Sequence, residues 1–426
     1  MPKVVVIGGG WAGCAAALSA KKAGSDVALY ERTDCLLGTG LVGGIFRNNG
    51  RFTAAEEMIA MGGGDLFMLA DQASRHANVD FPGHKHSSLY DVCLMEPSVR
   101  RALREEGVEV NLIARAMNVI RTGDRLEAIK LENGEIVEGD VFVETTGTAG
   151  PQGNCVKYGN GCAMCVLRCD SWGGRVSIAG RAGIEEKMGR KADGTIGAMS
   201  GSCKLHKDSV DPGIVAELNR TGVAVVPIPK HLVHKEKLAT KACQQYALPE
   251  FAENLVLLDT GHVKLMTPFY PLEELRSIPG MENARFEDPY SGGKGNSIRY
   301  LALSPRDDYL QVQGLDNLFC AGEKAGLLVG HTEAIATGVL AGHNAVRSAL
   351  GKELVAIPQS TAIGDSITFV REQMETEAGM GKKYTFSGDV YFKRMKELGL
   401  YTTDIPVIQE RVEAAGFSGY FAKRLI

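Results

Sequence analysis

The sequence contains no apolar run that approaches the ~20 residues needed to span a bilayer. It also shows no leader pattern, because a strand-like run begins at residue 3 without a cationic flank and a long apolar stretch before it. The net charge is only −4, from 47 basic and 51 acidic residues, so no overall field attracts nucleic acid or an anionic membrane. We therefore expect a cytoplasmic protein that does not bind a membrane.

Cysteine is sparse as well, since ten in 426 residues do not make a disulfide scaffold. The length predicts two to three domains at ~150 residues each. A hydrophobic content of 44% and a charged content of 23% are typical of a globular protein. Glycine is the exception: 52 residues are well above the usual level of ~7%. This excess predicts many close approaches of the backbone to a ligand or to another element.

The first forty residues contain a strand, a glycine-rich turn, a helix and a second strand. Residues 3–7 and 27–30 are apolar runs typical of strands buried on both faces. Between them stand Gly8, Gly10 and Gly13, followed by an alanine-rich helical stretch that reaches about residue 23. This is the βαβ pattern of a dinucleotide-binding fold.

Each position of this motif has a mechanical role. Gly8 makes the tight turn, Gly10 lets the backbone approach a pyrophosphate, and Gly13 lets the helix pack on the strand. Glu31, eighteen residues after Gly13, can accept the hydroxyl hydrogen bonds of a ribose. The predicted contacts from this segment are Gly8, Gly10, Trp11, Ala12, Gly13, Glu31, Arg32 and Gly38.

A second part of the same site is expected where residues 318–321 form an apolar strand that leads into Gly322 and Glu323. A Gly/Ala-rich helix follows from about residue 331 to 349. The acid can bind ribitol hydroxyls, and the helix dipole can stabilise negative charge on a flavin pyrimidine, so we predict FAD. The contacts expected from the later part of the chain are Thr146, Gly147, Gly322, Glu323, His331 and Ala334.

These patterns predict an α/β protein with a Rossmann-like, glutathione-reductase-like FAD-binding fold, a β-meander and an inserted α+β substrate domain. The meander is expected from strand-like runs between residues 108 and 144, with a hairpin at Asn133-Gly134. The expected domains are the first part of the FAD-binding domain (1–150), the inserted domain (151–285), the return segment of the FAD-binding domain (286–350) and a C-terminal helical appendix (351–426).

Four cysteines lie within fifteen residues in the pattern C-x6-C-x2-C-x3-C, namely Cys155, Cys162, Cys165 and Cys169. Such a set can hold a [4Fe-4S] cluster. A four-thiolate zinc site and metal-free, redox-cycling thiols are the alternatives. Cys203 is a possible replacement for one member of the set.

The remaining polar candidates receive simpler interpretations. Cys14, Cys35, Cys93, Cys243 and Cys320 are expected to be buried small apolar residues. His84 and His86 are expected in an exposed loop, and Glu185-Glu186 on a solvated face.

The later part of the chain resembles the flavoproteins that modify tRNA uridines. The residues that carry this resemblance are 279–284 (PGMENA), 318–323 (LFCAGE), 331–345 and 358–369. The similarity is to the glucose-inhibited division protein A class and to its shorter relative, the folate- and FAD-dependent tRNA (uracil-5-)-methyltransferase. That methyltransferase family carries a Cys in the stretch comparable to residues 41–47, where this sequence has none. The resemblance implies the FAD fold and places a further mechanistic Cys near Cys162 or Cys165.

We therefore predict a FAD-dependent oxidoreductase in which the cysteine cluster relays electrons, with Cys162, Cys165 and His331 as candidate catalytic residues. The first alternative is an enzyme that uses folate to methylate uracil in tRNA. The second alternative is an electron-transfer flavoprotein subunit. Because only one dinucleotide fingerprint is present, electrons are expected from a transient NAD(P)H or from a protein partner. A small-molecule or protein redox partner is favoured over tRNA on the net charge, and a homo-oligomer is expected.

Overall fold

The computed structural model describes residues 1–148, 168–190, 194, 196, 198–200, 202–240, 244–266, 270–287, 297–299 and 302–426. Its centre is a five-stranded parallel sheet with the strand order β19-β10-β1-β2-β6. The strands are β1 (Lys3–Ile7), β2 (Asp26–Tyr30), β6 (Glu109–Asn111), β10 (Val141–Glu144) and β19 (Leu318–Cys320). The expected α/β class with a Rossmann-type sheet is thereby confirmed.

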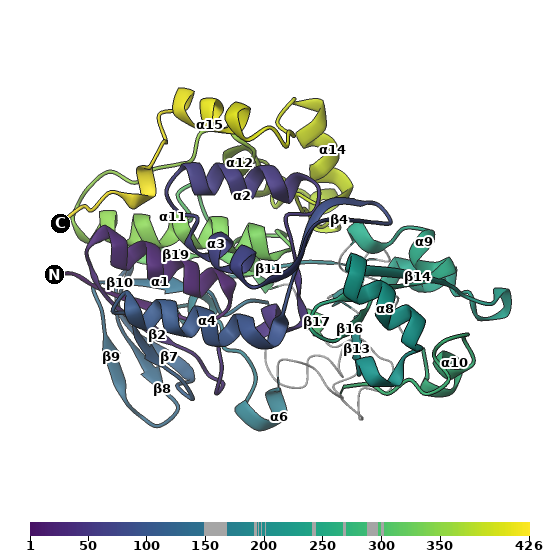
Figure 1. Cartoon of the computed structure of the whole chain (residues 1–426). Helices are drawn as coiled ribbons and strands as arrows, with labels where there is room; N and C mark the ends of the chain where they lie inside the picture. Colours follow the sequence, from purple (N-terminus) through teal and green to yellow (C-terminus); the bar gives the residue numbers. More distant parts are fainter. Residues whose placement is uncertain are drawn as a thin grey trace.

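Two helices, α1 (Trp11–Ala23) and α11 (His331–Ala349), pack against each other on one side of this sheet (Figure 1). The contact is close because α11 presents glycine to α1: a Cβ at Gly338 or Gly342 would overlap a backbone carbonyl oxygen of α1. The segment that carries the glycine motif is thus joined to the return segment, although more than 300 residues separate them in the sequence.

A β-meander of β7 (Ala116–Thr122), β8 (Arg125–Leu131) and β9 (Ile136–Glu138) lies on the other side of the sheet (Figure 1). The expectation that the run at 108–112 belongs to this meander was wrong, because β6 pairs in parallel with β2 at the edge of the main sheet. Alternation of residue types predicts a strand but does not identify its partner.

Helices from both ends of the chain cover α11 on the side away from the sheet (Figure 1). They share the main apolar core with the sheet. These helices are α2 (Gly50–Ala60), α12 (Ala362–Gln373), α14 (Asp389–Glu397) and α15 (Ile405–Ala414). The short helix α13 (Glu377–Met380) follows α12, while α3 (Asp65–Gln72) and α4 (Val92–Glu105) pack nearer to α1.

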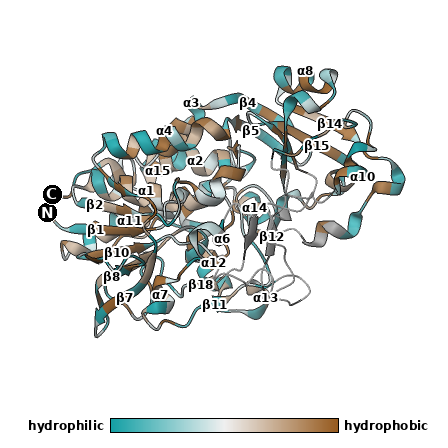
Figure 2. Ribbon diagram, turned by 90° about the horizontal axis from the view of Figure 1, so that it is seen from below, coloured by the Kyte–Doolittle hydropathy of each residue, from teal (hydrophilic) through white to brown (hydrophobic). Residues whose placement is uncertain are grey.

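A second region, which we call the antiparallel region (described residues 203–287), contains a four-stranded sheet ordered β13-β16-β15-β14. Its strands are β13 (Cys203–Leu205), β14 (Val223–Pro227), β15 (Asn254–Asp259) and β16 (Val263–Leu265), and its helices are α8 (Pro212–Thr221), α9 (Glu250–Glu253) and α10 (Leu272–Arg276). Much of β14 and β15 is coloured as hydrophobic in Figure 2. Apolar residues of these strands belong to a core cluster of the antiparallel region.

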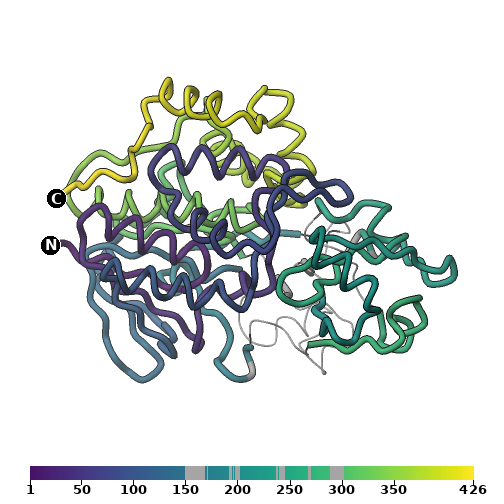
Figure 3. Tube along the Cα trace, in the orientation of Figure 1, coloured from purple at the N-terminus to yellow at the C-terminus, as the bar shows by residue number. Residues whose placement is uncertain are grey.

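The antiparallel region is joined to the rest of the molecule by a small sheet of β3 (Ile45–Phe46), β4 (Ser74–Phe81) and β5 (His84–Tyr90), visible as the dark blue hairpin in Figure 3. Val79 and Leu89 of this sheet share a core cluster with Phe251 and Val256. The chain before residue 100 therefore contributes to both regions.

The shorter strands are β11 (Lys187–Met188) with β18 (Ala302–Leu303) and β12 (Ala198–Ser200) with β17 (Ser297–Arg299). The short helices are α6 (Cys169–Trp172), α7 (Ile178–Arg181) and the 3-10 turns η1 (Gly38–Val42), η2 (Lys207–Ser209), η3 (Lys230–Leu232), η4 (Lys235–Thr240), η5 (Gln244–Tyr246), η6 (Gly322–Ala325) and η7 (Tyr420–Ala422). Among the described helices none is long and apolar enough to cross a membrane.

Candidate functional site

A cavity of about 1670 Å³, including the open solvent at its mouth, lies at the carboxyl ends of β1, β2 and β10. Gly8, Glu31 and Thr145, the residues that follow these three strands, all line it. In open α/β sheets this is the edge at which ligands bind, because the helix N-termini that follow the strands point toward it.

Thirteen of the fourteen residues predicted to contact a dinucleotide line this one cavity. They are Gly8, Gly10, Trp11, Ala12, Glu31, Arg32, Gly38, Thr146, Gly147, Gly322, Glu323, His331 and Ala334. The fourteenth, Gly13, does not, because it faces the strand: a Cβ there would overlap the carbonyl oxygen of Gly8. The tertiary structure therefore brings together the two halves that the sequence keeps apart.

The glycine turn is shaped for a ligand that approaches the backbone. Gly8 has φ +105°, and a Cβ on it would lie 2.5 Å from the carbonyl oxygen of Thr145. At Gly10, by contrast, an added Cβ would meet nothing within 4 Å. Because Gly10 lines the cavity, this open space is available to a pyrophosphate at the N-terminus of α1.

Glu31 is held in place by the backbone at the end of β2. Its Oε2 accepts a hydrogen bond from the Gly9 amide at 2.7 Å, and its Oε1 accepts one from the Thr33 amide at 2.9 Å. Each carboxylate oxygen can accept more than one hydrogen bond, so the oriented carboxylate keeps capacity for ribose hydroxyls.

The lining of the cavity is basic although the chain as a whole is slightly acidic. Six Lys or Arg residues line it against two Glu: Arg32, Arg51, Arg115, Arg168, Arg175 and Lys264 against Glu31 and Glu323. Burial and, to a smaller extent, the nearby positive charge of Arg175 lower the pKa of Arg32 to about 10. Two adjacent cations in a partly dry site favour an anionic ligand, which would relieve their repulsion.

His331, the first residue of α11, lies in an aromatic cluster, with its ring centroid 5.9 Å from that of Trp11 and 5.4 Å from that of Phe46. A Cβ on Gly43 would overlap this imidazole ring and lie 2.6 Å from the hydroxyl oxygen of Tyr90. In the loop where the resembling methyltransferases carry a Cys, a side chain at Gly43 would therefore require His331 and Tyr90 to move.

The family model described as "Glucose inhibited division protein A" matches residues 3–254 and 259–353. The chain belongs to this family. The resemblance inferred from the sequence is thereby confirmed, and the FAD-type cavity described above is the cavity of a glucose inhibited division protein A family member.

Individual relatives of this family match only part of the chain. The methylenetetrahydrofolate–tRNA-(uracil-5-)-methyltransferase TrmFO of Lactobacillus acidophilus is 41% identical over 95 residues, 22% of this chain and 20% of that protein. The tRNA uridine 5-carboxymethylaminomethyl modification enzyme MnmG of Chlorobaculum tepidum is 34% identical over 116 residues, 27% of this chain and 18% of that protein. The aligned parts thus span about a fifth of the length of these relatives.

The fold comparison covers nearly the whole chain. The structure of Aquifex aeolicus GidA in one crystal form matches with a TM-score of 0.69 and 17% identity over 98% of this chain and 74% of that one. A second crystal form gives a TM-score of 0.60 at 16% identity over 97% of this chain and 78% of that one. At this identity the likeness shows the fold alone.

In this family member the lining of the cavity also includes Arg51 from α2, which the sequence marked only as part of a modest basic patch at residues 46–51. Four further lining residues were not singled out by the sequence: Gln245 and Tyr246 from η5, and Lys264 and Met266 from β16 and the residue after it. Lys264 donates to the Val42 carbonyl oxygen and to Ser202 Oγ. No local motif marks these positions, since they come from three separate segments.

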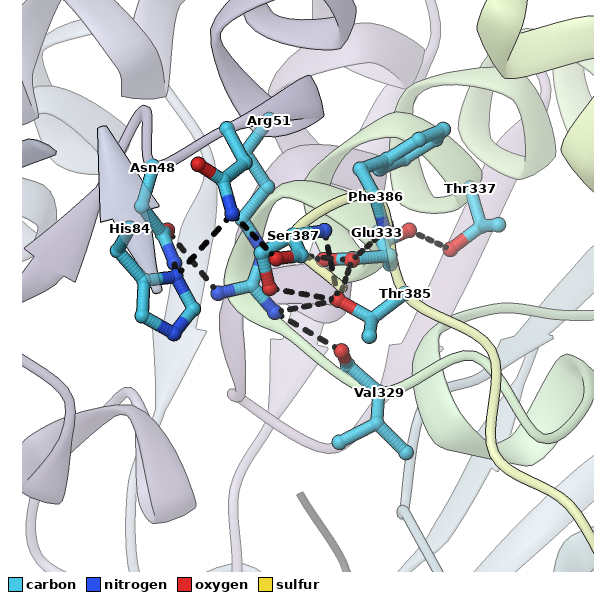
Figure 4. A network of polar contacts seen from close by, with 10 residues as sticks. Asn48, Arg51, His84, Val329, Glu333, Thr337, Thr385, Phe386 and Ser387 are labelled. Atoms are coloured by element: carbon cyan, nitrogen blue, oxygen red, sulfur yellow. Dashed lines mark hydrogen bonds and ion pairs between the residues drawn. The ribbon is translucent and has the colours of Figure 1, made fainter. Parts of the chain in front are cut away.

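Arg51 is the centre of a buried polar cluster, which we call the arginine network (Asn48, Arg51, His84, Glu333, Thr385; Figure 4). Its Nε lies 3.2 Å from Glu333 Oε2, and its Nη2 donates to Thr385 Oγ1 at 3.0 Å. Its Nη1 donates to Asn48 Oδ1 at 3.3 Å. The network connects α2, α11 and the segment before α14 beneath the cavity.

His84 was expected in an exposed loop, and this was wrong: it is 1% exposed in β5. Its Nε2 lies 3.0 Å from the carbonyl oxygen of Gln245, which can only accept, so Nε2 carries the proton and Nδ1 accepts from Asn48 Nδ2 at 3.0 Å. Burial lowers the pKa of His84 to about 3, so the ring is neutral. The Pro82-Gly83 pair before His84 predicts a loop, but the His84 ring is buried because it packs against Phe81 and Tyr246.

Two further expectations were wrong. Cys93 is exposed rather than buried, and its Sγ lies 3.1 Å from His262 Nε2. Glu186 is not on a solvated face, because it pairs with the buried Lys324, which also lies 3.6 Å from Glu144. Cys14 and Cys320 are buried as expected, and Cys35 is half-buried.

Three of the four predicted metal ligands, Cys155, Cys162 and Cys165, lie outside the described residues. Cys243, which was predicted to be buried, also lies outside them. Cys169 is described at the start of α6, close enough to Arg32 to influence its pKa. In the part of the chain that the structure describes, no three His, Cys, Asp or Glu side chains are arranged to hold a metal ion.

Proposed function

We propose that this chain binds FAD in the cavity at the carboxyl end of the parallel sheet and uses it to modify uridine in tRNA. The observation that carries the proposal is the convergence of both halves of the glycine and acid motif on one cavity in a member of this family. The names of the relatives, which act on tRNA uracil and tRNA uridine, support the substrate class.

The residues present fit FAD. The N-terminus of α1 and the open space at Gly10 would accept the pyrophosphate, Glu31 would bind the adenosine ribose, and Glu323 would bind ribitol hydroxyls. The N-terminus of α11 would stabilise negative charge on the flavin pyrimidine. When bound, FAD supplies hydride or two-electron chemistry. The protein supplies orientation, a basic lining and exclusion of water.

The part of the cavity lined by Gln245 and Lys264 suits a planar base with both hydrogen-bond donors and acceptors. Gln245 is buried and lines the cavity, and its Oε1 accepts no hydrogen bond from the described residues. A buried unpaired carbonyl is costly, so a ligand N–H such as the imino group of uracil would stabilise it. Lys264, on the same wall, would donate to a carbonyl oxygen of the base.

From the sequence we predicted a FAD-dependent oxidoreductase, with modification of tRNA uracil as the alternative. The function proposed above follows that alternative. The low net charge argued against a polyanionic substrate, but the basic lining supplies locally what the whole chain lacks. The crowding at Gly43 favours a reaction that uses no thiol in that loop. The iron-sulfur and NAD(P)H predictions stay open, and counting iron and sulfide in anaerobically purified protein would test the former.

Flavin binding is tested first. Purified protein should show the two absorption bands of oxidised flavin, or acquire them with added FAD. Gly10→Val should remain folded by circular dichroism and lose the bands, since its side chain fills the space for the pyrophosphate. A wild-type protein that ignores added FAD would refute the proposal.

Substrate class is tested with undermodified tRNA, labelled methylenetetrahydrofolate and a reductant. We expect a change at uridine by mass spectrometry, and an affinity for tRNA that falls steeply with salt. Gln245→Leu should abolish turnover with flavin retained, whereas Gln313→Leu, at an exposed glutamine, should leave it unchanged. Label in the product identifies methylation; a redox activity without any tRNA change would restore the first prediction.

A further inference from the structure

A group of three side chains outside the FAD-type cavity has the geometry of a nucleophile, a base and an orienting acid. We call it the thiol cluster (Cys93, His262, Glu287). Cys93 Sγ lies 3.1 Å from His262 Nε2, and His262 Nδ1 lies 2.5 Å from Glu287 Oε1. None of the three lines the cavity.

The three residues come from three separate segments that meet where the antiparallel region faces α4. Cys93 is the second residue of the 14-residue helix α4, and His262 precedes β16. Glu287 is fixed by its backbone, because its amide donates to the Lys204 carbonyl oxygen at 2.8 Å beside the bridge between Leu205 and Phe286. The arrangement is thus a product of the tertiary fold.

The carboxylate sets the state of the imidazole. A carboxylate oxygen accepts, so Nδ1 of His262 carries the proton and the lone pair of Nε2 faces the thiol of Cys93. The same oxygen of Glu287, Oε1, also lies 3.2 Å from His206 Nδ1. His262 is therefore oriented as a base toward the thiol.

The thiol needs such a base. Partial burial raises the pKa of the Cys93 thiol, and the charges of Asp91 and Glu287 raise it further, while Lys204 acts in the opposite direction. At neutral pH the group is therefore mainly protonated, and transfer of its proton to His262 is the route to a thiolate.

The hydrogen bonds of the backbone around Cys93 argue against acyl transfer and are compatible with disulfide exchange. Acyl transfer needs free N–H donors for an oxyanion. The first amides of α4 are all engaged: Val92 N with the Thr260 carbonyl oxygen, Cys93 N with Asp91 Oδ1, and Leu94 N and Met95 N with the Asp91 carbonyl oxygen. Exchange with a disulfide needs no oxyanion donor, since the charge moves from one sulfur to another.

We propose that the thiol cluster is a reactive-thiol site that exchanges with small disulfides, independently of the proposed FAD and tRNA chemistry. His262 takes the proton of Cys93, and the thiolate attacks one sulfur of the disulfide. A new S–S bond to Cys93 forms as the old one breaks, and the leaving thiolate takes the proton back from His262. No net oxidant is consumed beyond the disulfide itself, and an external thiol reverses the step.

The test uses the full-length protein and 2-hydroxyethyl disulfide at pH 7, with the mixed disulfide at each cysteine followed by peptide mass spectrometry. His262→Gln should slow modification of Cys93 by at least ~10-fold, as expected for loss of a positioned base. Glu287→Gln should slow it less. The matched control is His234→Gln, at a half-buried histidine that lies 3.1 Å from Glu236 and does not contact Cys93.

The pH profile separates a base from a merely structural role. In His262→Gln the rate at Cys93 should rise about tenfold per pH unit above pH 7, following the thiolate fraction alone. In the wild type and in His234→Gln the rise should be much shallower. If His262→Gln and His234→Gln give the same rate and the same profile at Cys93, the thiol cluster is not a reactive site and the proposal fails.

Discussion

The parallel sheet and the antiparallel region place their polar residues differently. In the parallel-sheet region, Glu31 and Thr145 face the cavity from positions that directly follow strand ends, and the middle residues of β1, β2 and β10 are apolar. In the antiparallel region a polar cluster lies where the region meets β4: Asp259 is buried and pairs with Arg75, His76 and Lys207.

This difference shows two ways to build a site. The first depends on a local motif, in which glycines remove side chains so that backbone and ligand come close. The second depends on contact between regions, in which charged residues from distant segments become partners only after the fold forms. The arginine network and the thiol cluster are of the second kind.

The largest loss of stability is expected at Gly13, where the glycine motif lets α1 pack against β1. Gly13→Val would place its side chain against the Gly8 carbonyl oxygen, so α1 could not dock on β1. We expect no stable folded protein, with a loss of at least ~3 kcal/mol. Circular dichroism with urea unfolding measures this, and Gly10→Val, which has open space, should remain folded. Equal stability of the two variants would contradict the division of roles within the motif.

A smaller effect is expected in the arginine network. Arg51→Met leaves the fully buried carboxylate of Glu333 without its guanidinium, which should cost about 3–5 kcal/mol. Arg285→Met breaks an exposed pair with Asp208 in the antiparallel region and should cost about 0–1 kcal/mol. Urea unfolding measures the free energy of unfolding of both variants. Similar losses of this free energy would mean that burial does not make the Arg51–Glu333 pair more important for stability than the Arg285–Asp208 pair.

The antiparallel region has its own core, and Leu257→Ala tests whether that core is separable. Leu257 is fully buried in β15, so the cavity should cost about 2–4 kcal/mol. We expect this loss to appear as an earlier thermal transition, with flavin released only in a later one. Flavin fluorescence during heating reads this directly. Simultaneous release would show that the two regions unfold as one.

The last expected effect is a change of slope with pH at the hairpin that joins the regions, and it is small at any one pH near neutrality. The pKa of His84 is lowered to about 3, against ~6.5 in an unfolded chain. The unfolded state therefore binds more protons between these values, and stability falls as the pH drops through this window, by up to ~1.4 kcal/mol per unit. His84→Gln should flatten that slope in urea unfolding at pH 4–7. A slope in His84→Gln equal to that of the wild type would contradict the assignment of this pH dependence to His84.

The fold was predictable where one segment carries its whole signal. The βαβ unit and the helix after Glu323 were located from the sequence because strand, glycine and helix are adjacent in the chain. The partner of β6 was not, and neither was the burial of His84, because both depend on segments far away. The missed cavity residues Gln245 and Lys264 stand in a stretch with no motif at all.

The sequence by itself determined that a dinucleotide-type turn, an acid after the second strand and a glycine-rich return helix are present. Glycine and apolar runs act locally, so their effect can be read from neighbouring residues. Only the tertiary structure decided that Arg51 meets Glu333, that His262 faces Cys93, and that His331 fills the space beside Gly43. Such pairs depend on which distant segments the apolar cores bring together. The sequence shows that a side chain is charged or can form hydrogen bonds, but it does not show which other residue will be its partner.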